Sequence, residues 1–156
     1  VVVLANAMGA QRLARQLGQE LPIHEAPAVL LRFGAAQVPL RHLLYGQGLE
    51  VRPGLGGGLL SADDFPGEEG MAELGRESLQ AVASLFQPEC ELSLQSIRAV
   101  YRPKTDSGLP LRTFLDGCEG LYVMVAHPGV ILAPALGYEA CEDILKGQVH
   151  GDAYAC

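Results

Sequence analysis

The chain has 156 residues, of which 49% are apolar, with 18 Asp and Glu against 11 Lys and Arg and a net charge of −7. This length and composition predict an ordinary globular protein with a packed core, and they exclude extended disorder. No run of Lys or Arg occurs, which disfavours nucleic-acid binding. No apolar run reaches the roughly 20 residues that a membrane span needs.

The four cysteines are widely and irregularly spaced, at Cys90, Cys118, Cys141 and Cys156. No Cys-x-x-Cys pair and no neighbouring His pair accompanies them, so the pattern gives little support to a zinc site. Scattered thiols without a signal peptide are typical of a reducing compartment, and we therefore predict a cytoplasmic protein.

The chain opens on an aliphatic run, Val1 to Ala5, which is typical of a buried parallel strand. Proteins seldom begin at the first residue of a central strand, so we expect sequence that precedes this one. A tight turn is predicted at 6–9, followed by a helix at about 10–19 that Gly18 and Pro22 terminate.

Residues 25–61 show the two-residue period of a half-buried sheet. Val29, Leu31 and Phe33 alternate with Leu30 and Arg32. Further strands are predicted at 43–45, 49–51 and 59–60, with a glycine-rich turn at 54–58, so this region is expected to form an antiparallel meander.

A helix follows the meander. Asp63 and Asp64 are interpreted as part of an acidic helix start, because carboxylates favour that end of the helix dipole, and the helix is predicted over 68–86. A metal or acid–base role for these carboxylates is the alternative.

The last third is predicted to contain a strand at 92–101, a loop at 103–110, a strand at 120–126 and a helix at 130–146. Two α/β pieces therefore bracket a β-rich insert, and the predicted class is α/β (α+β).

Two segments of the last third are candidates for chemistry. His127, Pro128 and Gly129 lie between a buried strand and a helix, where ligands bind in open α/β sheets; an ordinary turn is the alternative. Arg102 ends an apolar strand and is suited to a bidentate grip on a carboxylate; a surface ion pair is the alternative.

Together these segments resemble a known signature. Four segments occur in this order: Arg102-Pro103-x-Thr105-x-x-Gly108-Leu109-Pro110, Gly120-Leu121-Tyr122-Val123, His127 and Leu132-Ala133-Pro134-Ala135-Leu136-Gly137. They are similar to the C-terminal pattern of the D-amino-acid oxidase/glycine oxidase family, approximately R-P-x-T-x-D-G-x-P, G-L-Y-x-A-x-G-H and L-A-P-x-x-G. The opening Val1 to Ala7 also looks like that family's strand and turn beside the cofactor.

The resemblance implies an FAD-dependent oxidoreductase that oxidises the C–N bond of an amino acid or amine by hydride transfer to flavin. It implies that the C-terminal part of a Rossmann-like FAD-binding domain brackets an antiparallel substrate-binding sheet. The expected boundaries are 1–20 for the end of the FAD-binding domain, 21–99 for the substrate-side domain and 100–156 for the return to the FAD-binding domain. The expected partners are a small amine or amino acid and the missing N-terminal half of the same protein.

The resemblance also implies site residues. Arg102 is expected at the substrate carboxylate, and the helix that begins near Val130 is expected to stabilise reduced flavin with its N-terminus. Tyr45 is a further candidate for the substrate pocket, with packing on the sheet as its alternative. No side-chain general base is expected, because a neutral amine can donate hydride directly. The expected cofactor-binding residues are Ala5, Asn6, Ala7, His127, Pro128, Gly129, Val130 and Ile131.

A non-catalytic binding or structural module, as a degenerate relative or a subunit of the same family, is the competing interpretation. The family's Gly-x-Gly-x-x-Gly fingerprint for the dinucleotide is absent from this sequence, and the turn after His127 is shorter than the family's. Gly54 to Gly58 precedes two leucines and a turn, so we interpret it as a hairpin. The ADP part of FAD is therefore not expected to bind to this chain alone.

Overall fold

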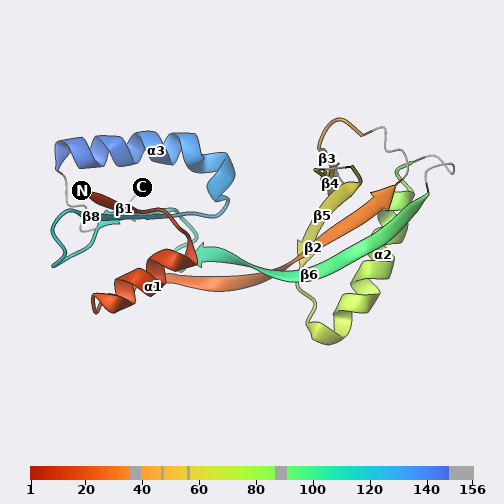
Figure 1. The fold of residues 1–156 in the computed structure, drawn as a ribbon, viewed down its shortest axis with the longest axis horizontal. Coiled ribbons are helices and arrows are strands. Elements are labelled where there is room, and N and C mark those ends of the chain that lie inside the picture. The colour runs from red at the N-terminus through yellow and green to blue at the C-terminus, as the bar shows by residue number, and fades with distance from the viewer. Residues whose placement is uncertain (36–39, 47, 56, 87–90, 148–156) are drawn as a thin grey trace. The chain divides into compact units, whose positions relative to one another are not determined.

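The computed structural model describes residues 1–35, 40–46, 48–55, 57–86 and 91–147. The chain divides into two compact units, one formed by residues 1–26 and 102–156 and the other by residues 27–101. Figure 1 shows the elements of each unit.

The first unit contains a small mixed sheet in the order β1 (Val2–Leu4), β8 (Leu121–Val125) and β7 (Leu111–Phe114). β1 pairs with β8 in parallel, and β7 pairs with β8 antiparallel. The helices α1 (Met8–Gln16) and α3 (Gly129–Lys146) lie on opposite sides of this sheet (Figure 1).

The face of the small sheet toward α1 is apolar. Val123 and Val125 of β8 pack with Ala10 and Ala14 of α1 in a cluster of buried side chains. Ile23, at the start of β2 (Ile23–Ala35), belongs to the same cluster. Removing these side chains from water is the main favourable contribution to packing in this unit.

The second unit contains a five-stranded antiparallel sheet. The strands are ordered β3 (Leu44–Gly46), β4 (Leu49–Pro53), β5 (Leu59–Asp64), β2 and β6 (Leu92–Thr105). A short 3-10 helix (Glu68–Gly70) leads into α2 (Met71–Ala83).

The core of the second unit follows the period predicted for β2. Val29, Leu31 and Phe33 are buried, whereas Arg32 is exposed. Val82 of α2 is fully buried in the same cluster. A Cβ on Gly75 of α2 would lie 2.8 Å from Leu94 Cδ2, so the absence of a side chain there lets α2 approach β6.

Several sequence predictions were wrong in position. β2 pairs with β5, so only β3, β4 and β5 form a meander. Asp63 and Asp64 are the last two residues of β5 rather than the start of a helix. They lie there because β5 pairs with β2 up to its end, where Asp63 is opposite Val29 and Asp64 is opposite Ala28. The first helix ends at Gln16, since Gly18 takes a φ of 74°.

The region between β6 and β8 also differs from its prediction. β6 continues through Arg102 to Thr105, so the predicted loop at 103–110 starts only after Thr105. β7 was not predicted at all, because its four residues, Leu-Arg-Thr-Phe, carry too short a pattern to identify.

β1 is parallel, as predicted, but it is not buried among the described residues. Val1, Val2 and Val3 are 71%, 61% and 43% exposed. β1 is the outermost strand of the small sheet in the described part of the chain, with β8 on one side only. Apolar side chains on such an edge are unusual in a free surface.

Candidate functional site

Two turns lie at the same edge of the small sheet because β1 and β8 are parallel neighbours. Leu4, the last residue of β1, is level with Val123 of β8. α1 follows β1 and α3 follows β8 after short turns, so both helices begin at this edge (Figure 1). We call it the carboxyl edge. It presents two helix N-termini, each with a partial positive charge.

The first turn holds Ala5, Asn6 and Ala7. The N–H groups of Gly9 and Ala10 donate to the carbonyl oxygens of Asn6 and Ala7, each at 3.0 Å. A Cβ on Gly9 would lie 2.4 Å from Asn6 Nδ2, so the Asn6 side chain folds back against the first turn of α1. Ala7 has a φ of 55° and a ψ of −127°, a conformation that a residue with a Cβ rarely adopts.

The second turn holds His127, Pro128 and Gly129, joined by a cis His127–Pro128 peptide bond. All three residues are exposed. A Cβ on Gly129 would meet no atom within 4 Å. Val130 and Ile131, which open α3, are 91% and 77% exposed. The turn therefore presents open backbone beside an apolar surface.

Two cations accompany this turn. Partial desolvation, followed by repulsion from Arg102 and then Lys104, lowers the pKa of His127 below its ordinary value of 6.5. Arg102 and Lys104 occupy alternate positions of β6. The carboxyl edge is thus electropositive through side chains as well as helix dipoles.

The structure brings Ala5, Asn6 and Ala7 to the same edge as the turn at 127–131, and it places Arg102 in the same unit. Tyr45 belongs to the other unit. It is 81% exposed on β3 and lines a cavity of about 370 Å³ together with Leu49 of β4, Leu85 and others.

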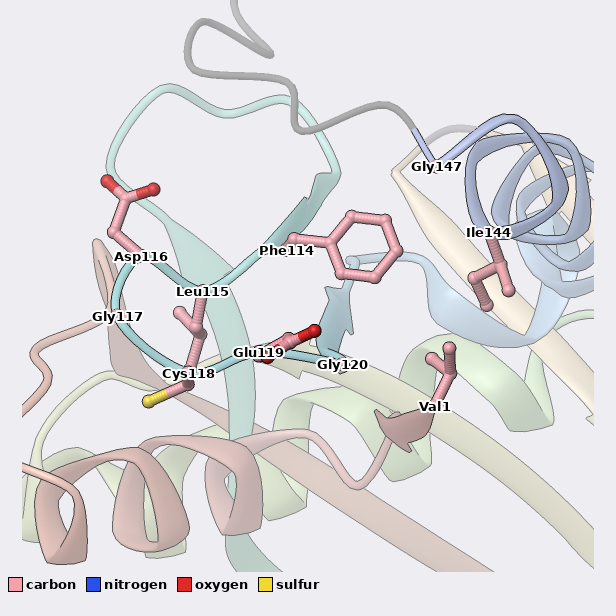
Figure 2. A pocket seen from close by; sticks show the side chains of 10 residues that line it. All are labelled: Val1, Phe114, Leu115, Asp116, Gly117, Cys118, Glu119, Gly120, Ile144 and Gly147. Atoms are coloured by element: carbon pink, nitrogen blue, oxygen red, sulfur yellow. The ribbon is translucent and has the colours of Figure 1, made fainter.

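A larger cavity, of about 620 Å³, lies at the opposite end of the small sheet. Figure 2 shows Val1, Phe114 and Ile144 directed toward a common space. Asp116 and Glu119 are its charged lining residues. Carboxylates disfavour a phosphate-bearing ligand, so this cavity does not match the chemistry of the carboxyl edge.

Sequence reasoning missed the polar contacts that hold α3 to the sheet. The buried Asp143 carboxylate accepts hydrogen bonds from Tyr122 Oη at 2.6 Å and from Arg112 Nη1 at 2.5 Å. One signal was available: Asp143 falls on the same helical stripe as Leu136 and Ala140, where an apolar residue is expected. Lys104 was missed as well, because an exposed lysine carries no pattern.

Within the described residues, no group of three or more His, Cys, Asp or Glu side chains is arranged to hold a metal ion. Among the same residues, no helix is both long and apolar enough to cross a membrane. Cys118 and Cys141 are free thiols, while Cys90 and Cys156 lie outside the described residues.

The fold is similar to one part of several solved oxidase and deaminase structures. The solved structure of L-amino acid deaminase from Proteus vulgaris matches 97% of the chain with a TM-score of 0.72 at 18% identity. Glycine oxidase from Geobacillus kaustophilus matches 97% with a TM-score of 0.64 at 22% identity. The chain covers 40% and 42% of these two proteins.

The sequence points to one of these enzymes in particular. Glycine oxidase of Pseudomonas putida strain KT2440 is 29% identical over 157 residues, which cover 94% of this chain and 41% of the relative. No family model matches the chain. The chain is therefore a partial-length relative of glycine oxidase, and the resemblance predicted from the sequence is confirmed. It spans about two fifths of the length of the curated relative.

Proposed function

We propose that the chain forms the substrate-side sheet and the C-terminal cofactor elements of an FAD-dependent oxidoreductase that oxidises the C–N bond of an amino acid or amine. The observation that carries this proposal is the carboxyl edge, where two helix N-termini and two exposed turns meet at the ends of parallel strands. Ligands bind at this position in open α/β sheets. The relationship to glycine oxidase supplies the reaction class.

The residues of the carboxyl edge fit the ring end of a flavin. Gly129 leaves open space for a planar ring to approach the backbone, and Val130 and Ile131 offer apolar contact. Bound FAD would accept a hydride from the substrate. The first turn of α3 would stabilise negative charge on the ring, and the turn at 5–7 would contact it from β1.

The same residues do not fit the rest of the cofactor. A dinucleotide site needs a glycine-rich turn into a helix and an acid about 20 residues further along the chain, and this sequence has no Gly-x-Gly-x-x-Gly. We propose that the remaining part of the FAD-binding domain contacts β1. The exposed apolar side chains of Val1, Val2 and Val3 on the outer strand support a further parallel strand at this position.

Arg102 is the residue that we propose for the substrate carboxylate. It lies near His127 on β6, so a carboxylate bound there would be close to the carboxyl edge. Its guanidinium offers a planar pair of donors that matches the geometry of a carboxylate. Tyr45 is proposed as a second substrate contact on the strength of its exposure beside a cavity. In this assignment the first unit carries the cofactor elements, and the second carries the substrate-side sheet.

The visible absorption spectrum of the purified protein, recorded with the remaining part of the FAD-binding domain present, tests the proposal. Flavin bands, present from the start or after addition of FAD and removal of the excess, are the expected result. A protein that remains colourless after FAD is added would contradict the proposal and favour the non-catalytic module. The missing fingerprint and the coverage of 41% of glycine oxidase are the observations that favour this second candidate.

A further inference from the structure

The two helices of the first unit are attached to the sheet in different ways. α1 packs through an apolar cluster that includes Ala10, Ala14 and Val123. On β8 and β7, Tyr122 and Arg112 alternate with the residues of that cluster, so they face the side of α3. There a polar attachment accompanies the buried apolar residues Leu136 and Ala140 of α3.

Asp143 is the centre of this polar attachment. It is only 5% exposed, and one of its oxygens, Oδ2, accepts a hydrogen bond from each of two strands, through Tyr122 and Arg112. Burial, and then the hydrogen bond to Asp143, raise the pKa of Tyr122 above its ordinary value, so its hydroxyl stays a donor. Arg112 Nε lies 3.2 Å from Glu139 Oε2, one turn earlier on α3. We call Asp143, Arg112 and Tyr122 the clamp.

The clamp holds the C-terminal half of α3, whereas the first turn of the helix is exposed. Leu136, Ala140 and Asp143 are the buried residues of the helix, while Val130 and Ile131 are almost fully exposed. Gly129 and Asp143 are separated by about 21 Å along the helix at a rise of 1.5 Å per residue. A small rotation at the clamp would therefore move the first turn of α3 by a larger distance.

Arg112 and Asp143 form a partly buried ion pair, with side chains that are 31% and 8% exposed, and its formation costs desolvation energy that an apolar contact would not. Orientation of the helix therefore explains its presence better than stability does. We propose that Asp143 is a positioning residue, which fixes the axis of α3 so that its N-terminal N–H groups point at the flavin ring. This inference rests on the function proposed above. Asp143 does not touch the cofactor or the substrate; it acts through the helix.

The test compares Asp143→Asn with Glu142→Gln in the full-length protein. Both changes remove one negative charge from neighbouring positions of α3, but Glu142 contacts Lys146 Nζ, at 2.5 Å, on the outer side of the helix. Tyr122→Phe is the third variant, because it removes only one hydroxyl from the clamp and keeps the ring beside Phe114.

The first readout is amide hydrogen exchange in the N-terminal half of α3, which requires no flavin. Asp143→Asn is expected to accelerate it about tenfold, Tyr122→Phe less, and Glu142→Gln not at all, with exchange in α1 unchanged. If a folded Asp143→Asn protein shows unchanged amide exchange in the N-terminal half of α3, the clamp does not hold the helix. If Asp143→Asn does not fold, Tyr122→Phe decides by the same criterion.

The second readout is the bound flavin itself. Asp143→Asn is expected to raise the dissociation constant of FAD about tenfold, as for the loss of a helix-dipole interaction with an anion, and to make the flavin midpoint potential more negative. If amide exchange in α3 becomes faster in Asp143→Asn while the dissociation constant of FAD and the flavin midpoint potential stay unchanged, the positioning role of Asp143 is overturned. A wild-type protein that binds no FAD would overturn both this role and the proposed function, while the exchange data would still show whether the clamp holds α3.

Discussion

Arg102 and Lys104 place two positive charges beside His127. Partial desolvation of the imidazole, followed by repulsion from these two cations, lowers the pKa of His127. Two neighbouring cations are suited to receive a carboxylate. This arrangement is set by residues that are far apart in the sequence and meet only in the fold.

The first prediction concerns this charge coupling. Arg102→Ala is expected to raise the pKa of His127 toward its ordinary value of 6.5, because protonation no longer occurs beside that cation. The imidazole proton shifts in an NMR titration measure the change. Lys104→Ala should shift the pKa in the same direction by less, since its effect is the smaller of the two. An unchanged His127 pKa in Arg102→Ala would show that the two groups are not coupled.

Arg102→Ala is also expected to raise KM for a carboxylate-bearing substrate about 100-fold or more, because a charge-assisted bidentate contact is lost. Steady-state kinetics with the flavin-loaded protein provide the measurement. Arg98→Ala is the matched control, since Arg98 lies exposed on the same strand. If KM is unchanged, Arg102 does not contact the substrate.

At the scale of elements, α2 covers the five-stranded sheet through a narrow stripe. Gly75, Ser78 and Val82 are its buried residues. Val82→Ala is expected to lower the free energy of unfolding by about 2 kcal/mol, through lost burial and a small cavity. Glu77→Ala, at an exposed position of the same helix, is expected to change it by less than about 0.5 kcal/mol. Urea unfolding followed by circular dichroism measures the free energy of unfolding of both variants. Equal losses in Val82→Ala and Glu77→Ala would contradict the packing of α2 on the sheet.

Elements with a strong local pattern were predictable. The continuous apolar run of β8 and the helix after it were found within one or two residues, and the alternation in β2 identified its buried face. The pairing of β2 with β5 was not predictable, because long-range pairing leaves no local signal. β7 was missed for lack of length, and Asp63 and Asp64 were misassigned because acidic residues are as acceptable on an exposed strand end as at a helix start.

The candidate site was predictable only in part. The turn at 127–129 stood out because a strand, a turn and a helix follow one another directly. The clamp was not predictable, because the role of Asp143 depends on its hydrogen bonds with Tyr122 and Arg112, which lie on two different strands. The position of Asp143 on the apolar stripe of α3 was the one signal in the sequence, and it does not identify the partners on the strands.

At the scale of the whole molecule, the chain contains two compact units and corresponds to about two fifths of glycine oxidase. β2 and β6 each continue from one unit into the other. Among the described residues, the small sheet has only three strands, and its outer strand exposes apolar side chains. In our account this strand is where the remainder of the cofactor domain binds.

The most direct test of the account is the absorbance of the flavin-loaded protein after anaerobic mixing with glycine and with N-methylated glycine. Because hydride moves from the substrate to flavin, we predict that the flavin band is bleached by at least one of these amines. The matched 2-hydroxy acid, which lacks the C–N bond, should leave the band unchanged. A flavin band that persists with every amine tested, while a chemical reductant still bleaches it, would contradict the assignment of C–N oxidation.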